Sequence, residues 1–259
     1  MKRVALFLVA LSLSMLLASP AARAVETRVT VRVRAHDAKF IGTGVGGVQV
    51  VVRDADTGRF LASGLVEGGT GDTKTLMKTP ISRGQRLSDG SAAAYVATLD
   101  IDEPTRIEVI ARGPLAAGSS VQTSSRTLWV LPGQDVTGDG VLLELQGFLV
   151  YPVTPAPHQF YRVGDEVAVE AHVTMMCGCP IKPGGLWDAD KYAVKALVQR
   201  DGKQVAELNL VYAGATSRFK AAYRPDEPGS YKVLVTAADP STNNFGVGVT
   251  SFVVKKAAK

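Results

Sequence analysis

The segment Glu166–Met176 reads EVAVEAHVTMM and alternates apolar and polar side chains over most of its length. This alternation is typical of a β-strand with one buried face, because successive side chains point to opposite sides of a strand. The residues that share the apolar face, and are therefore expected in a core, are Val167, Val169, Ala171, Val173 and Met175. Glu170, His172 and Met176 share the other face.

Similar short patterns, separated by turn residues, occur on both sides of this segment. The strand patterns that follow are Tyr192–Arg200, Gln204–Val211, Arg218–Tyr223, Tyr231–Ala237 and Val247–Val254. Those that precede it are Val29–Arg34, Val48–Arg53, Phe60–Leu65, Ala93–Asp100, Arg106–Ala111, Arg126–Leu131 and Val141–Leu145. Many short strands at regular spacing are the pattern of β-sandwiches. The sequence therefore predicts an all-β protein with two tandem β-sandwich domains, residues 25–150 and residues 158–256.

Two segments are less regular. Residues 151–157, Tyr-Pro-Val-Thr-Pro-Ala-Pro, contain three prolines. Because proline cannot donate to a strand ladder and stiffens the chain, this segment is predicted to be an extended connector between the two domains. Residues 73–85 fit either a short helix or an irregular loop.

Two further segments resemble known families. Residues 226–233, Asp-Glu-Pro-Gly-Ser-Tyr-Lys-Val, resemble the tyrosine corner of immunoglobulin-like domains, with Val233 where antibody domains have a cysteine. This resemblance implies that Tyr231 is largely buried and that its hydroxyl donates to nearby backbone. Residues 46–73 resemble the carboxypeptidase-regulatory-like β-sandwich modules related to transthyretin. Both families imply binding or scaffolding roles, although a fold alone does not fix a function.

The amino terminus predicts export. Two basic side chains precede the largely apolar run Val4–Ala18, and Ala22 and Ala24 are small at the positions that a signal peptidase recognises. The run is shorter than the roughly 20 residues of a membrane-spanning helix. Residues 1–24 are therefore predicted to be a cleaved signal peptide, and the remainder is expected to be periplasmic or secreted and not membrane-spanning.

Charge and motifs exclude several classes of function. The formal net charge of +5 falls largely on residues 1–24, and both signs of charge are interspersed in the rest of the chain, which argues against nucleic-acid binding. No Gly-x-Ser-x-Gly and no His-Glu-x-x-His motif occurs in the sequence. The three histidines, His36, His158 and His172, are far apart along the chain. We therefore expect a protein without catalytic machinery of its own.

The two cysteines are the most unusual feature of the chain. Only Gly178 separates Cys177 from Cys179, so they cannot cross-link distant segments. Thiolate and thioether sulfur are soft ligands that select Cu(I) over calcium or magnesium. The candidate ligands of a Cu(I) site are Cys177, Cys179, Met176, His172 and His158.

Besides inert packing of both cysteine side chains, three interpretations of this pair stay open. The thiolates bind Cu(I), with Gly178 bending the chain, and the protein handles this soft metal. Alternatively, the cysteines form a local disulfide in a structural or adhesive interaction module. As a third class, they are the redox pair of a thiol–disulfide protein, although the Cys-x-x-Cys motif of thioredoxin-like enzymes is missing. In each case the expected partner is another exported or membrane-bound protein.

The immunoglobulin arrangement also predicts where this loop lies. With Glu166–Met176 as strand B and Tyr231–Ala237 as strand F, the B–C loop carries the cysteines and lies at the same end as the F–G loop, residues 239–246. Strand A is expected to begin at that end and to bring His158 close. The cysteine loop is therefore predicted to face the first domain, with Trp187 either covering the loop or simply packing.

Overall fold

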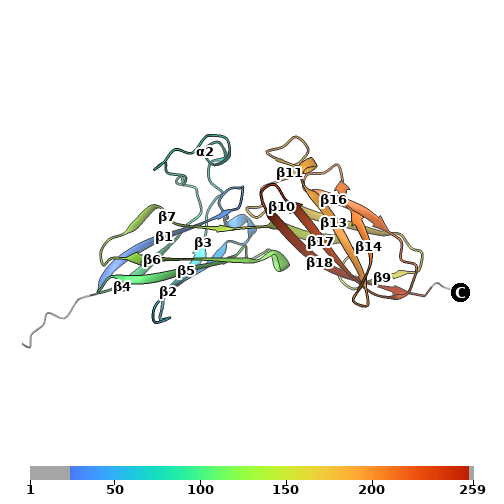
Figure 1. Cartoon of the computed structure of the whole chain (residues 1–259), viewed down its shortest axis with the longest axis horizontal. Helices are drawn as coiled ribbons and strands as arrows, with labels where there is room; N and C mark the ends of the chain where they lie inside the picture. Colours follow the sequence, from blue (N-terminus) through green and yellow to red (C-terminus); the bar gives the residue numbers. More distant parts are fainter. Residues whose placement is uncertain (1–23, 257–259) are drawn as a thin grey trace, which may run out of the picture.

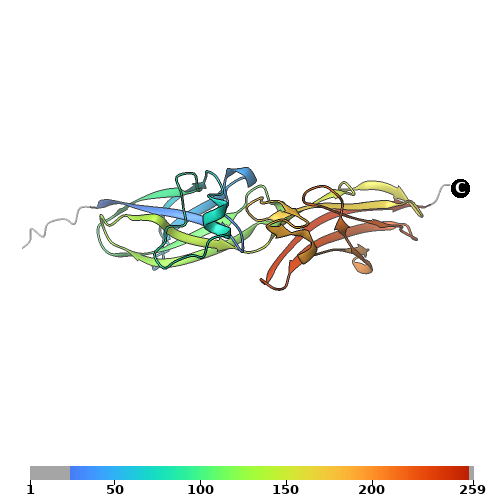
Figure 2. The ribbon, with the colours of Figure 1, turned by 90° about the horizontal axis from the view of Figure 1, so that it is seen from above.

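The computed structural model describes residues 24–256 of the 259-residue chain. The predicted signal peptide, residues 1–24, lies outside the described residues apart from its last residue. The regular secondary structure of the described chain is nearly all β, and the strands form two β-sandwiches arranged end to end (Figures 1 and 2). The predicted all-β fold class is confirmed. Among the described residues, no helix has the length and apolar character needed to cross a bilayer.

The first sandwich contains a three-stranded and a four-stranded sheet. The three strands are, in spatial order, β4 (Tyr95–Ile101), β1 (Val25–Ala35) and β7 (Val136–Leu145). The four strands are β3 (Phe60–Val66), β2 (Val48–Asp54), β5 (Thr105–Gly113) and β6 (Gln122–Val130). Alternate residues of β1, β2 and β5 are fully buried between the sheets, including Val31, Val50 and Val109. The period-two pattern of the sequence thus fixes which face of each strand enters the core.

Short elements connect these strands. The undecided segment 73–85 begins as a five-residue helix, α2 (Thr73–Met77), with Asp72 capping its amino terminus through a 2.7 Å hydrogen bond from the Thr75 N–H. A 3-10 turn, η1 (Thr43–Val45), precedes β2, and another, η2 (Gly118–Ser120), precedes β6.

The second sandwich contains a four-stranded and a five-stranded sheet. The four strands are β15 (Val211–Tyr212), β16 (Arg218–Tyr223), β10 (Val167–Met175) and β8 (Phe148–Thr154). The five strands are β14 (Lys203–Asn209), β13 (Ala193–Arg200), β17 (Gly229–Asp239), β18 (Asn244–Lys255) and β9 (Gln159–Arg162). The five residues of β10 predicted to face the core are each at most 1 % exposed.

This strand order is that of an immunoglobulin-like sandwich. Strands β8, β10, β16 and β15 occupy the places of A, B, E and D in one sheet, and β13, β17 and β18 those of C, F and G in the other. The tyrosine corner is also present. Tyr231 is 2 % exposed, and its hydroxyl donates a 2.8 Å hydrogen bond to the Glu227 carbonyl oxygen, as the resemblance implied.

The predicted connector is partly a strand. Residues 151–154 lie in β8, which pairs with β10 from Phe148 to Thr154, so the second sandwich begins at Phe148 and not at residue 158. Pro152 lies in the edge strand β8, next to a shift in its register with β10, and prolines in sheets occur at edges and bulges. Only residues 155–158 connect β8 to β9 in the opposite sheet.

The two sandwiches share one continuous hydrophobic core cluster. On the side of the second sandwich, β8 passes directly over β18. A Cβ atom at Gly248 would lie 2.3 Å from the Val150 carbonyl oxygen, and one at Gly246 would lie 2.7 Å from the Phe148 carbonyl oxygen. Only glycine allows this close approach of two backbones.

Candidate functional site: the cysteine loop at the junction

The cysteine loop follows β10 directly. Gly178 has a φ of +76°, and its N–H donates a 2.8 Å hydrogen bond to the Met175 carbonyl oxygen, so the chain reverses after β10. The Met175 N–H in turn donates to the Cys179 carbonyl oxygen at 3.1 Å. This turn brings the Cα atoms of Cys177 and Cys179 to 5.3 Å, and the two sulfurs form a disulfide. The bend at Gly178 that the sequence analysis required is therefore present.

The loop faces the first sandwich, as predicted. A Cβ atom at Gly178 would lie 2.7 Å from the Val45 Cγ1 atom of η1. Trp187, in the short strand β12 (Trp187–Asp188), is 6 % exposed, and its indole Nε1–H donates a 3.0 Å hydrogen bond to the Asp37 carbonyl oxygen. Trp187 therefore packs against the loop and also links the two sandwiches.

A cavity of about 300 Å³ lies between the loop and the first sandwich. Lys39, Thr70 and Thr73 of the first sandwich line one side, and the other side consists of Cys177, Gly178, Cys179, Pro180 and Trp187. The Lys39 ammonium group donates to the Thr73 hydroxyl at 3.0 Å and to the Gly71 carbonyl oxygen at 3.5 Å. The disulfide and an ammonium group thus border the same small space.

A second polar link crosses the junction at His36. Its Nδ1 atom lies 2.6 Å from a Glu144 carboxylate oxygen, and its Nε2 atom lies 2.8 Å from the Thr242 carbonyl oxygen in the F–G loop. Both neighbours are acceptors, and only a protonated imidazole has two N–H donors. The hydrogen bond with Glu144 accordingly raises the pKa of His36 above its usual value.

Sequence reasoning did not identify the groups that the first sandwich contributes. His36, Lys39, Thr70 and Thr73 precede the cysteines by more than 100 residues and form no motif with them. The isolation of His36 as one of only three histidines was the single available signal. Its role depends on tertiary packing, which local spacing does not encode.

Met176 and His172, two of the other predicted ligands, have neighbours away from the cysteine pair. Met176 is fully buried, and a Cβ atom at Gly147 would lie 3.6 Å from its Cε atom. The His172 ring stacks on the Tyr151 ring, with 6.5 Å between centroids, on the outer side of β10. Within residues 24–256, no group of three or more His, Cys, Asp or Glu side chains is arranged to hold a metal ion.

The prediction that His158 lies near the cysteines is wrong. Strand A begins at Phe148, so His158 comes after its far end, where its N–H donates to the Ser251 carbonyl oxygen at 2.9 Å. Asn244 lies at the junction end of β18, and Ser251 is seven residues further along the strand. This separation places Ser251 about 23 Å from the junction end. Binding of Cu(I) by Cys177 and Cys179, with help from Met176 or His172, stays a prediction.

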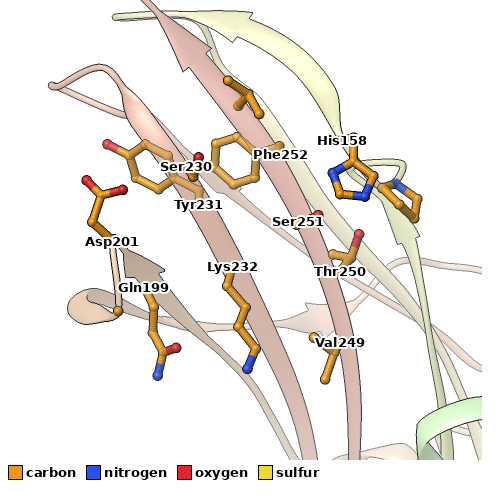
Figure 3. A pocket seen from close by; sticks show the side chains of 13 residues that line it. His158, Gln199, Asp201, Ser230, Tyr231, Lys232, Val249, Thr250, Ser251 and Phe252 are labelled. Carbon is orange, nitrogen blue, oxygen red and sulfur yellow. The ribbon is translucent and has the colours of Figure 1, made fainter.

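His158 instead borders a wider groove of about 530 Å³ on the outer face of the five-stranded sheet. Figure 3 shows Lys232 between Gln199 and Val249 on neighbouring strands of this groove. This groove is separate from the cysteine loop.

Comparisons with known proteins give no family. No protein-family model and no curated protein matches the chain. The solved structures that match include the CbhA fibronectin(III)-like modules of Clostridium thermocellum, with 10 % identity over 90 % of this chain and 95 % of theirs, at a TM-score of 0.30. The titin domains Z1Z2 in complex with telethonin match with 14 % identity over 91 % of each chain, at a TM-score of 0.25. A DUF3823 family protein from Bacteroides uniformis matches with 11 % identity over 88 % of this chain and 99 % of its own, at a TM-score of 0.30. Matches of this kind carry no argument about function, so the description of the fold rests on the strand order.

Proposed function

We propose that this chain is an exported, non-catalytic interaction module that binds another exported or membrane-bound protein through the outer face of β13, β17 and β18. The observation that carries the proposal is a row of exposed apolar side chains on β18. Phe245, Val247 and Val249 are 55, 40 and 43 % exposed and alternate along the strand, so they share one face. Contiguous exposed apolar surface on a soluble protein commonly marks an interaction site.

Neighbouring strands extend this row. Leu234 pairs with Val249 on one side and with Leu197 on the other, and both leucines are only partly buried. Lys232 lies on the same face of β17, and no ion pair of the described residues includes it. The partner that fits this face is a protein with apolar side chains beside a carboxylate, because the carboxylate would pair with Lys232.

Site-specific photo-crosslinking in the native exported fraction tests this proposal. A photo-reactive side chain replaces Val249 in one variant and Val211, an equally small residue that is 63 % exposed on β15, in the control. We expect one protein to be cross-linked at residue 249 and not at residue 211. Purified partner should then bind the wild type, and binding should weaken on Val249→Asp and Lys232→Glu. Equal cross-linking at both positions, or binding unchanged by both substitutions, would contradict the proposal.

Handling of Cu(I) by the reduced protein is a second candidate, favoured by one observation. The turn at Gly178 holds the two cysteine Cα atoms 5.3 Å apart, so after reduction two thiolates converge on a position suited to a soft ion. Competition for Cu(I) against a chromogenic chelator tests this candidate. We expect reduced wild type to compete and the Cys177→Ser/Cys179→Ser variant to lose affinity by orders of magnitude, because a hydroxyl is a hard ligand. Equal competition by the two proteins would eliminate copper handling.

A further inference from the structure

The junction cavity combines a disulfide with a cation that lacks an anionic partner. The Lys39 ammonium group uses two of its three protons, toward Thr73 and Gly71. Among the ion pairs of residues 24–256, none includes Lys39. A charged donor and the S–S bond therefore line the same cavity, and the charge is available to a ligand.

We propose that this cavity is a thiol–disulfide exchange site for a small thiol that carries a carboxylate. The carboxylate pairs with Lys39, which is a charge-assisted contact, and the thiol then lies next to the Cys177–Cys179 bond. A volume of about 300 Å³ suits a molecule of a few heavy atoms, since it is at the lower end of small-molecule sites.

The reaction proceeds by two exchanges. The thiolate of the first ligand attacks one cysteine sulfur, the S–S bond breaks, and its electron pair leaves with the other sulfur as a thiolate. The positive charge of Lys39 stabilises this thiolate until it takes up a proton. A second thiol molecule attacks the mixed disulfide and releases the oxidised ligand as its own disulfide. In the balance, two thiols are oxidised to one disulfide, and the protein disulfide is reduced to two thiols.

Burial makes the cavity the route of attack. Cys177 and Cys179 are each 5 % exposed and both line the cavity together with Lys39, whereas their loop neighbours Gly178 and Pro180 are exposed. A reductant therefore meets the disulfide through the space that Lys39 borders. The charge of Lys39 favours a thiol that carries a negative charge, and the volume of the cavity favours a small one.

Mercaptoacetate and 2-mercaptoethanol form a matched pair of probes, because they differ in charge and hardly in size. The rate of each with the oxidised protein is followed by intact mass and by labelling of free thiols. Each rate is divided by the rate of the same thiol with an unfolded peptide that carries the Cys-Gly-Cys disulfide, which removes the intrinsic reactivity. The variants are Lys39→Gln, Lys39→Arg and, as a control for loss of charge, Lys78→Gln, since Lys78 is exposed and outside the cavity.

At low ionic strength, we expect the normalised rate of mercaptoacetate to exceed that of 2-mercaptoethanol by about tenfold in the wild type, as one charge-assisted contact allows. The preference should disappear in Lys39→Gln, persist in Lys39→Arg and Lys78→Gln, and shrink with added salt. Equal normalised rates in the folded wild type, a preference unchanged by Lys39→Gln, or no reaction before unfolding would each overturn the proposal. None of these results bears on cross-linking at Val249, so the two proposals fail independently.

Discussion

The two ends of the second sandwich are stabilised in different ways. At the far end, Tyr231 bonds to Glu227, four residues earlier, and stacks on Phe252 with ring centroids 4.8 Å apart. At the junction end, Trp187 bonds to Asp37, which is 150 residues earlier in the chain. The far end is therefore complete within its own domain, whereas the junction end needs the first sandwich. Substitutions at the two ends should therefore differ in how much they lower the free energy of unfolding and in whether the effect depends on the first sandwich.

Removal of the Trp187 side chain should have the largest effect. Trp187→Ala creates a cavity at the junction and leaves the Asp37 carbonyl oxygen without its donor, which should lower the free energy of unfolding by about 3–5 kcal/mol. The chain has one other tryptophan, Trp129, which is 63 % exposed and makes a matched control. Urea denaturation should show little change for Trp129→Ala. If Trp187→Ala lowers the free energy of unfolding no more than Trp129→Ala does, then the contacts of Trp187 at the junction do not stabilise the protein.

Reduction of the disulfide should have a smaller effect. A cross-link that closes a loop of three residues removes little entropy from the unfolded chain, which corresponds to about 1.5 kcal/mol. Thermal unfolding with and without reductant measures this difference, and the Cys177→Ser/Cys179→Ser variant, which should not respond to reductant, is the control. A loss comparable to that of Trp187→Ala would show that the loop, and not the indole, organises the junction.

The hydroxyl of Tyr231 in the tyrosine corner should contribute about as much to the free energy of unfolding as one hydrogen bond. Tyr231→Phe removes the hydroxyl that donates to Glu227 and should cost about 0.5–1.5 kcal/mol, or more if the acceptor stays unpaired. Tyr212→Phe is the control, because no hydrogen bond of the Tyr212 hydroxyl occurs among the described residues. The same cost should appear in a fragment of residues 147–259, because every partner of Tyr231 named above lies within it. A cost confined to the full chain would contradict the self-contained corner.

The smallest expected effect is the pH dependence at His36. The pKa of His36 is raised in the folded state, so protonation of His36 adds to the free energy of unfolding. This contribution is fully present below the pKa of the unfolded state, near 6.5, and is lost as the pH rises through the pKa of the folded state. Glu144 and Asp37 are the charged groups that act on His36, while Arg34 pairs with Glu144 and Asp239 acts on Asp37. As a partly exposed contact it should contribute about 1 kcal/mol or less.

His172 should change the stability in the opposite direction as the pH falls, which makes it a comparison for His36. Burial, and then the nearby Arg218, lower the pKa of His172, so this residue should reduce stability as pH falls below about 6.5. Unfolding measured from pH 5 to pH 8 should therefore change in opposite directions for His36→Gln and His172→Gln. A stability profile that is identical in wild type and His36→Gln would remove His36 as a link between the sandwiches.

The same division explains what the sequence could predict. The core face of Glu166–Met176 and the tyrosine corner depend on neighbours in the chain, and both predictions are confirmed, although Thr174 and Met176 on the other face of the strand are buried as well. Strand β8 was missed because its proline resembles that of a connector, and only the pairing with β10 shows that it occupies a sheet edge. The cation in the junction cavity, Lys39, has no local pattern at all. The resemblance of residues 46–73 to transthyretin-related modules and the boundaries of independent folding stay predictions.

The disulfide between Cys177 and Cys179 also has a consequence for biogenesis. The chain contains no other cysteine, so oxidation has a single intramolecular product and cannot yield a mispaired isomer. Closure requires only that Gly178 adopt a positive φ, which costs glycine little even in an unfolded chain. The bond can therefore form as soon as these three residues meet an oxidant, before either sandwich has folded. A chain with this single pair of neighbouring cysteines depends on an oxidant but not on a disulfide isomerase.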